Sequence, residues 1–401
     1  MERQYLVTER AHFMCPNMHF GILVELKEQY NREKVLDTLN IQANAHPFLR
    51  STIRYEHTTN KLYYHIHDTS MIEFTELSNK NELWNIVKSL SKKEWNPFHN
   101  GLLKVYSFTD TEKMTVLFMA HHLLGDGRSI LNIVSEFADC YTGKIIPTYV
   151  EEHLIQSLDD LPDKSDLPLI SKLLIHNVNG KWKKEGRLID YQSYSDFVKY
   201  YVESHNIEYK EHMITSNTYQ DMMKSCKENN VSVNDVLMSH MYDKLGTKKL
   251  IIAVDIRKHL SCYRQGALGN YATAVSIISK LETSDIYKKA KEIHQLVKKK
   301  VGNNRQLMMV LSCYLNMDPG LLDAAAISAL NGFDSKAGAF VGSGMFGMAK
   351  PESYSLTNLG KIENDNIISA IFIPPASPAV KMTVGVVTVN DNMRICTSEN
   401  I

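Results

Sequence analysis

The chain has 401 residues, of which 44% are apolar and 22% charged, and its 45 basic residues balance its 45 acidic residues. This balance gives no electrostatic footprint for nucleic acid, so we expect no nucleic-acid partner. No apolar run approaches the roughly 18 residues that a membrane-spanning helix needs, and the length predicts two lobes rather than one core.

The first part of the chain alternates strand and helix patterns. Apolar residues recur at helical spacing after Asn31, a plausible N-cap, whereas the run MTVLFMA is wholly apolar and rich in β-forming residues. We predict an N-terminal lobe over residues 1–160. Its expected elements are a strand at 20–26, a helix at 31–45, a hairpin joined by Thr58, Thr59 and Asn60, a buried strand at 114–120 and a helix at 129–143.

The middle of the chain loses this regularity. The stretch SLDDLPDKSDLPL is rich in Pro, Asp and Ser, and we predict a linker or crossing segment over 161–190. The regular pattern then resumes, which predicts a C-terminal lobe over 191–401. Its expected elements are a helix at 231–246 with a capping box from Ser232 to Asp235, a strand at 249–257, a helix at 284–301, and strands at 367–373 and 382–389.

The spacing of the cysteines and the composition of the N-terminus indicate in which cellular compartment the protein is located. The six cysteines are scattered without a C-x-x-C pair, which favours buried thiols in a reducing environment. The first ten residues carry charges, but no apolar stretch follows them as it would in a signal peptide. We therefore expect a cytoplasmic protein.

The predicted strand at 114–120 runs into the stretch MAHHLLGDGRS, in which two adjacent histidines precede an Asp-Gly pair. Neighbouring residues of an extended segment point to opposite sides, so only one of His121 and His122 faces a given cleft. A neutral imidazole suits a general base, and Asp126 stands where a carboxylate caps a helix or orients a neighbour. The residues alone leave open a base, a metal site and a polar strand end.

The stretch HHLLGDG resembles the HHxxxDG signature of the chloramphenicol-acetyltransferase-like superfamily, which includes condensation domains and alcohol O-acetyltransferases. Other stretches are similar to the family's segments and follow in the family's order. They are LDTLNIQANAHPFLRSTI at 36–53, WNPFHNGLLKVYSF at 95–108, VSVNDVLMSHM at 231–241, the D-x-R and Gly-Asn pairs within 254–275, and SYSLTNLGKI at 353–362. The resemblance covers nearly the whole chain and fits a freestanding condensation-type unit.

The resemblance implies an α+β fold of two lobes, each a mixed sheet backed by helices, with an active-site tunnel between them. It implies that an acyl group moves from a thioester to a hydroxyl or amine, with His122 as the general base. We place Asp126 and Gly127 in the catalytic group, Gly127 as an oxyanion donor through its backbone N–H. Asp126 is implied to pair with Arg257 and hold the loop, while His121 packs inward as a structural residue.

The resemblance also implies which residues line the tunnel and which substrates bind in it. Asn270, Ser355 and Asn358 are candidate tunnel-lining residues. The donor is expected to be a thioester of coenzyme A or of a carrier protein's phosphopantetheine, acting as a co-substrate, and the acceptor a small molecule of natural-product biosynthesis. We expect no permanently bound cofactor and no metal, and a carrier protein is a candidate partner.

Two other functions remain open from the sequence. The first is a non-catalytic relative that keeps the fold as a binding module for a carrier protein. The second is a metal-dependent hydrolase in which His122 and Asp126 act with a distant histidine.

Overall fold

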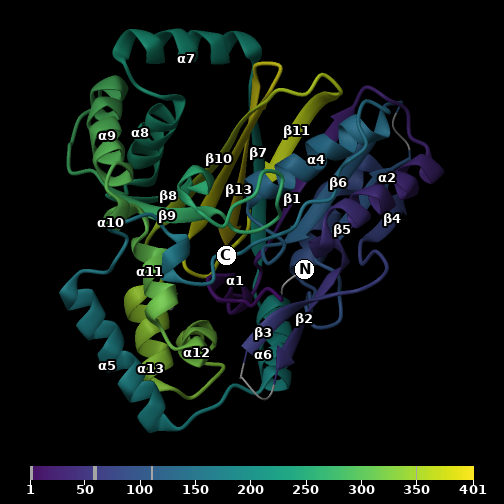
Figure 1. Ribbon diagram of the computed structural model, residues 1–401. Coiled ribbons are helices and arrows are strands. Elements are labelled where there is room, and N and C mark those ends of the chain that lie inside the picture. The colour runs from purple at the N-terminus through teal and green to yellow at the C-terminus, as the bar shows by residue number, and fades with distance from the viewer. Residues whose placement is uncertain (1–2, 57–60, 110–111, 349) are drawn as a thin grey trace.

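The computed structural model describes residues 3–56, 61–109, 112–348 and 350–401. Its strands form two large sheets and one hairpin, which Figure 1 shows with helices packed around them. The five-stranded sheet has the order β11 (Ile367–Ile373), β1 (His19–Leu26), β6 (Thr115–His121), β5 (Leu103–Phe108), β4 (Glu73–Leu77). The six-stranded sheet has the order β7 (Ile207–Ile214), β13 (Asn392–Asn400), β12 (Met382–Val389), β10 (Tyr354–Ile362), β8 (Lys249–Asp255), β9 (Ala272–Ile278). The hairpin pairs β2 (Ser51–Glu56) with β3 (Lys61–Ile66).

Both large sheets are mixed. In the first, β4 and β5 run parallel and the other neighbours are antiparallel. In the second, β10 runs parallel to both β12 and β8, while the remaining pairs are antiparallel. The predicted α+β class with mixed sheets backed by helices is confirmed. The predicted turn residues Thr58, Thr59 and Asn60 lie outside the described residues.

The helices follow the expected pattern at most positions. They are α1 (Arg10–Phe13), α2 (Arg32–Ala45), α3 (Leu83–Ser91), α4 (Gly127–Tyr141), α5 (Leu169–Glu185), α6 (Tyr191–Ser204), α7 (Ser216–Asn229), α8 (Val233–Leu245), α9 (Ile286–Val301), α10 (Asn304–Leu307), α11 (Met309–Asn316), α12 (Pro319–Ala329) and α13 (Lys336–Ala339). The predicted N-cap of Asn31 and the capping box of Ser232 and Asp235 are confirmed. Among the described residues, no helix combines the length and apolar character needed to cross a membrane.

The wholly apolar run of β6 is explained by burial on both faces. Val116, Phe118 and Ala120 pack into the core shared with α2 and α4, whereas Leu117 and Met119 pack on the opposite face, where α3 contributes Leu83 and Val87. A strand covered on both sides has no polar face, so its sequence does not alternate. This rigid, buried strand carries the histidine pair at its end.

One strand crosses between the two predicted lobes. β11 comes from the region 191–401 but pairs with β1 of the N-terminal sheet, and Figure 1 shows this yellow strand beside the dark strands of the N-terminal part. β11 also lies against β12 and β13 of the second sheet. The two sheets are therefore joined by shared chain as well as by packing, while the predicted lobe boundaries stay a prediction.

The segment predicted as a linker over 161–190 contains a long helix. α5 occupies 17 of these residues and packs Ile175, Val178 and Trp182 against α12 and its neighbours. Its apolar residues lie on more than one face, so the sequence lacks the single apolar stripe that marks an ordinary surface helix. The linker prediction rested on the Pro-, Asp- and Ser-rich stretch SLDDLPDKSDLPL, which ends at the first residue of α5.

Candidate active site

The histidine pair stands where β6 ends and turns toward α4. His121 closes the strand and pairs with His19 of β1, and His122 is the first residue beyond the strand. The His122 backbone N–H donates to the Met18 carbonyl at 2.7 Å, which holds the turn against β1. The rigid strand therefore fixes the position from which the His122 ring projects.

The His122 ring is held by a residue from the other sheet's loops. Asn270, just before β9, accepts a hydrogen bond from His122 Nδ1 at 2.8 Å, and its Nδ2 donates to the His122 carbonyl at 2.9 Å. Because the amide nitrogen is committed to that carbonyl, the amide oxygen faces the ring and can only accept. The hydrogen of the neutral ring is therefore on Nδ1, and Nε2 carries the free lone pair.

His122 is half-buried, whereas Asn270 is buried. Burial lowers the pKa of His122 below its usual value, while the hydrogen bond to Asn270 and the charge of Asp126 act in the opposite direction. The ring is consequently neutral at neutral pH, with a basic nitrogen that has no hydrogen-bond partner among the described residues. A half-buried neutral imidazole with a free Nε2 can accept a proton from a bound hydroxyl or amine.

A third histidine, which the sequence analysis missed, packs on the first. The His12 ring of α1 stacks on the His122 ring with centroids 3.9 Å apart and planes inclined by 6°, and Phe20 meets the His122 ring edge-on. Burial, and then the neighbouring His122 and His121, lower the pKa of His12 well below its usual value. Two protonated rings at this spacing would repel strongly, so the stack keeps at most one charge. No pattern in the sequence indicates that His12 contacts His122, because His12 lies 110 positions before it in an ordinary charged stretch.

His121 points to the other side of the sheet, as expected for neighbouring residues of an extended segment. It is buried beside Trp95 and His19, and its Nδ1 accepts a hydrogen bond from the Leu123 N–H at 3.2 Å. Burial lowers its pKa to about 3, so the ring is neutral and structural at neutral pH. It borders a small pocket of about 30 Å³, which has room for roughly one water molecule.

Asp126 is the N-cap of α4 and is saturated by hydrogen bonds. Its Oδ1 accepts from the backbone N–H groups of Arg128 and Ser129 at 3.0 and 2.9 Å, and its Oδ2 accepts from the Tyr271 N–H at 2.8 Å. Tyr271 belongs to the loop before β9, so the same carboxylate caps one lobe's helix and ties it to the other lobe. The carboxylate is buried, and none of its hydrogen-bond partners among the described residues is His122.

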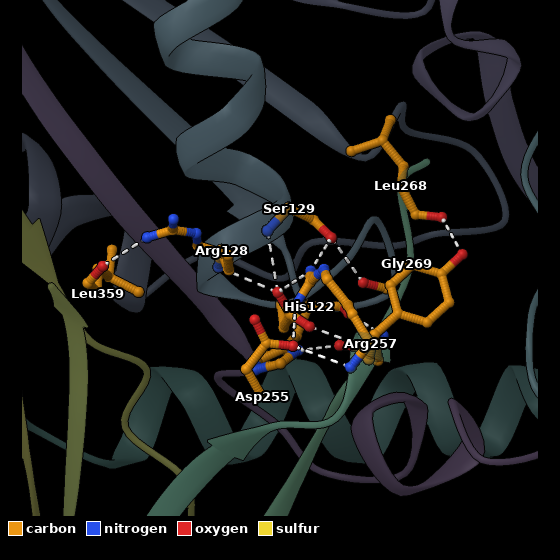
Figure 2. Close-up of polar contacts among 11 residues, drawn as sticks. His122, Arg128, Ser129, Asp255, Arg257, Leu268, Gly269 and Leu359 are labelled. Carbon is orange, nitrogen blue, oxygen red and sulfur yellow. Dashed lines mark hydrogen bonds and ion pairs between the residues drawn. The ribbon is translucent and has the colours of Figure 1, made fainter. Parts of the chain in front are cut away.

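Arg257 completes this cross-lobe connection, the pair that the family resemblance implied. Its Nη2 donates to Asp126 Oδ1 and to Ser129 Oγ, each at 2.7 Å, and its Nη1 donates to Asp255 Oδ1 at 3.1 Å. Figure 2 shows Arg257 between Asp255 and Ser129, with Gly269 beside them. Burial opposes the charge of Arg257, but the two carboxylates outweigh it and raise its pKa. The guanidinium thus stays charged and holds the loop.

Two glycines of the HHLLGDG stretch allow neighbouring segments to pack closely against the backbone. A Cβ on Gly125 would lie 2.9–3.0 Å from Ser129 and from the backbone of Gly269, and Asp126 N–H donates to the Gly269 carbonyl at 3.1 Å. A Cβ on Gly127 would lie 2.7 Å from Leu359 Cδ2. Gly125 therefore lets the two lobes touch, and Gly127 lets α4 pack on β10. The Gly127 N–H, at the first position of α4, has no hydrogen-bond partner among the described residues.

The remaining predicted site residues, Ser355 and Asn358, make other contacts. Asn358 Nδ2 donates to Asn234 Oδ1 of α8 at 2.7 Å, and Asn358 Oδ1 accepts from the Gly360 N–H. Ser355 is half-buried in β10, and neither residue is hydrogen-bonded to His122 in the described part of the chain. Within the same residues no group of three or more His, Cys, Asp or Glu side chains has metal-binding geometry.

The comparisons with known proteins agree with this architecture. Residues 9–152, which include the histidine pair and Asp126, match the family model described as "Condensation domain". Comparison with curated protein sequences gives no match.

Solved structures extend the likeness over the whole chain. The trichothecene 15-O-acetyltransferase TRI3 from Fusarium sporotrichioides is 11% identical, with a TM-score of 0.65 over 99% of this chain and 90% of that one. Polyketide synthase associated protein 5 from Mycobacterium tuberculosis is 12% identical, with a TM-score of 0.60 over 100% and 92%. The epimerization domain from the third module of tyrocidine synthetase B is 12% identical, with a TM-score of 0.56 over 98% and 88%. At these identities the likeness shows the fold.

Proposed function

Since the chain has the fold of the chloramphenicol-acetyltransferase-like superfamily and residues 9–152 match its condensation domains, we propose that it is an acyltransferase with His122 as the general base. The observation that carries this proposal is the hydrogen bond between His122 Nδ1 and Asn270 Oδ1 at 2.8 Å, which leaves Nε2 free. Acyl transfer in general is supported by the family match and by the acetyltransferase among the structural neighbours.

The proposed reaction needs no covalent enzyme intermediate. His122 Nε2 takes the proton of the acceptor's hydroxyl or amine as its oxygen or nitrogen attacks the thioester carbonyl carbon. The tetrahedral oxyanion collapses, the carbon–sulfur bond breaks, and the thiolate takes the proton from His122 Nε2. The products are an ester or amide and a free thiol, and His122 returns to its neutral form. Binding both reactants in line contributes much of the acceleration.

The residues around His122 fix the position of its ring and stabilise the charge that develops on the oxyanion. Asp126 and Arg257 hold the loop that carries His122, while the stacked His12 ring restrains the orientation of the base. The unpartnered N–H of Gly127 is the proposed donor to the oxyanion, because donors at a helix N-terminus are aligned with its dipole. Asn270 acts by fixing the tautomer of His122.

The proposed co-substrate is a thioester of coenzyme A or of carrier-protein phosphopantetheine, in a tunnel between the lobes. The condensation family acts on thioesters tethered to carrier proteins, which supports a carrier protein as partner, while TRI3 is an O-acetyltransferase, which supports a hydroxyl acceptor. The proposed acceptor is a small molecule of natural-product biosynthesis, and the proposed compartment is the cytoplasm.

The other two functions are less well supported by the geometry. A metal-dependent hydrolase would use Asp126 as a ligand, but its oxygens are occupied by three backbone N–H groups and the Arg257 guanidinium. A non-catalytic binding module would not need an imidazole held in one tautomer with a free nitrogen.

The test is thiol release from a panel of acyl-coenzyme A and acyl-pantetheine donors, with alcohols and amines as acceptors. The wild-type chain is expected to turn over at least one pair, and His122→Ala to lose about 10²–10⁴-fold in kcat, the usual contribution of a general base. His121→Phe serves as the matched control on the neighbouring ring. Turnover unchanged in His122→Ala would refute the base, and no turnover with any pair would favour the binding module.

A further inference from the structure

Helix α5 exposes apolar side chains on the side away from the protein. Four of its first six residues are large aliphatics that face solvent: Leu169 is 73% exposed, Ile170 82%, Leu173 55% and Leu174 40%. The opposite side of α5 is already used, because Ile175, Val178 and Trp182 are buried against the neighbouring helices. The exposed aliphatics therefore do not contribute to the core, and such a concentration on a surface marks an interaction site.

The second half of the same helix is positively charged. Lys181, Lys183 and Lys184 are all exposed, and Lys181 lies 5.9 Å from the centre of the Phe340 ring. A groove between α5 and the π-helical turn η5 (Phe340–Met345) joins the two halves, since its lining includes both Leu174 and Lys184. We call these four aliphatics and three lysines the α5 surface.

Nearby acidic groups do not cancel this charge. Glu185 turns inward, where its carboxylate accepts hydrogen bonds from Ser335 Oγ at 2.6 Å and the Ala337 N–H at 2.8 Å. Asp166 pairs with Lys172 at 3.2 Å. The three lysines outnumber the one carboxylate of Glu185, so the α5 surface presents aliphatic side chains beside a net positive charge, which is complementary to an anionic partner.

The composition favours a lipid surface over a protein. Protein interfaces are enriched in Tyr, Trp, Met and Arg and depleted in Lys, whereas the α5 surface consists of Leu, Ile and Lys. Leu with Lys is the composition of helices that lie in a membrane interface, with aliphatic side chains in the acyl boundary and ammonium groups at the anionic headgroups. Figure 1 shows α5 at the outer edge of the molecule, where a flat surface can reach it.

We propose that the α5 surface binds anionic lipid membranes peripherally, with Leu169, Ile170, Leu173 and Leu174 entering the interface and Lys181, Lys183 and Lys184 contacting headgroup phosphates. This binding involves no spanning segment and does not depend on the acyltransferase reaction. It concentrates the chain at a membrane surface, where amphiphilic small molecules also collect.

Flotation of the full-length chain with vesicles tests the proposal. The probes are vesicles of phosphatidylcholine alone and of an equimolar mixture of phosphatidylcholine and phosphatidylglycerol. Wild type is expected to float with the anionic vesicles, and less so at high salt. The variant L169Q/I170Q/L173Q/L174Q, in which Gln preserves helix propensity, is expected to stay in the soluble fraction. The variant K181Q/K183Q/K184Q is expected to bind about 100-fold more weakly, at about fivefold per lysine.

The matched control is I146Q/M223Q, which replaces exposed apolar residues outside α5 and is expected to float like wild type. Unchanged melting temperatures establish that the variants are folded. The proposal is overturned if wild type does not bind anionic vesicles or if the aliphatic variant binds as wild type does. It is also overturned if sedimentation shows a wild-type dimer that the aliphatic variant cannot form, because a second copy would then cover the surface.

Discussion

His122 Nδ1 lies 2.8 Å from Asn270 Oδ1, so a residue in a loop of the six-stranded sheet determines where the proton sits on a residue at the end of the five-stranded sheet. A contact between the two lobes therefore favours the form of His122 in which Nε2, the proposed basic nitrogen, is free. This hydrogen bond therefore links the packing of the two lobes to the proposed chemistry.

The first prediction concerns pH. The proposed mechanism requires neutral His122, and burial lowers its pKa, so kcat/KM is expected to fall only at pH values below the usual pKa of histidine. The Asn270 hydrogen bond raises that pKa, so Asn270→Ala should move the acid limb to lower pH and reduce kcat/KM about tenfold. Asn270→Asp places a carboxylate there and should move the limb to higher pH. Two shifts in the same direction would contradict this account.

The second prediction concerns Asp126. In Asp126→Asn the amide cannot accept from all four donors, and Arg257 is left without its buried counter-charge. We expect a loss of about 3 kcal/mol in the free energy of unfolding, with activity falling in parallel. Thermal melts and kcat/KM are measured together, and Arg257→Gln is the partner variant whose effect should not add to it. Lost activity at an unchanged melting temperature would make Asp126 directly catalytic.

The third prediction separates the stacking of His12 from its chemistry. His12→Phe keeps a flat ring against His122, so kcat should stay within about threefold of wild type. His12→Leu loses the flat face, and a base displaced by about 1 Å is expected to cost up to about 10²-fold in kcat with little change in KM. Equal losses in both variants would mean that the imidazole itself takes part in the reaction.

The fourth prediction isolates the Gly127 N–H. Proline is tolerated at the first position of a helix and lacks the N–H, but any Cβ at this position meets Leu359. We therefore compare G127P/L359A with G127A/L359A, which has the same space and retains the N–H. If this N–H stabilises the oxyanion, the proline variant should have a kcat about 10²-fold lower than the alanine variant. Equal kcat values would assign the oxyanion to another donor.

The sequence predicted local elements and the contacts encoded by the signature. β6, α4 and the cap at Asp126 follow from local pattern, and Arg257 and Asn270 follow from two further motifs in the family's order. Contacts without a local signal were not predictable. The pairing of β11 with β1 and the stacking of His12 on His122 join distant segments, and nothing in either segment specifies its partner.

Residue type alone did not predict which of the candidate tunnel residues contacts His122. Asn270 faces the base, but Asn358 has the same side chain and binds Asn234 of α8 instead. Asn358 stands at the irregularity where β10 shifts register against β12. A single sequence does not reveal such a shift.

The last prediction concerns Glu152, which follows α4 in the chain, is fully buried and has no part in the proposed chemistry. Burial raises its pKa well above the usual value, although the backbone N–H of Phe48 acts in the opposite direction. A carboxyl group with a raised folded-state pKa binds its proton more tightly in the folded than in the unfolded chain. Its contribution to stability is therefore present below the ordinary pKa and is lost as pH rises through the folded-state pKa.

Glu152→Gln removes this titration while keeping the size of the side chain. Its melting temperature should match that of wild type near pH 4 and exceed it at pH 8 by about 2 °C, equivalent to about 1 kcal/mol. Glu151→Gln, at the adjacent half-buried position, is the matched control for the substitution itself and is measured at the same two pH values. A Glu152→Gln variant less stable than wild type at pH 8 would mean that the carboxylate is charged and well solvated in the folded chain.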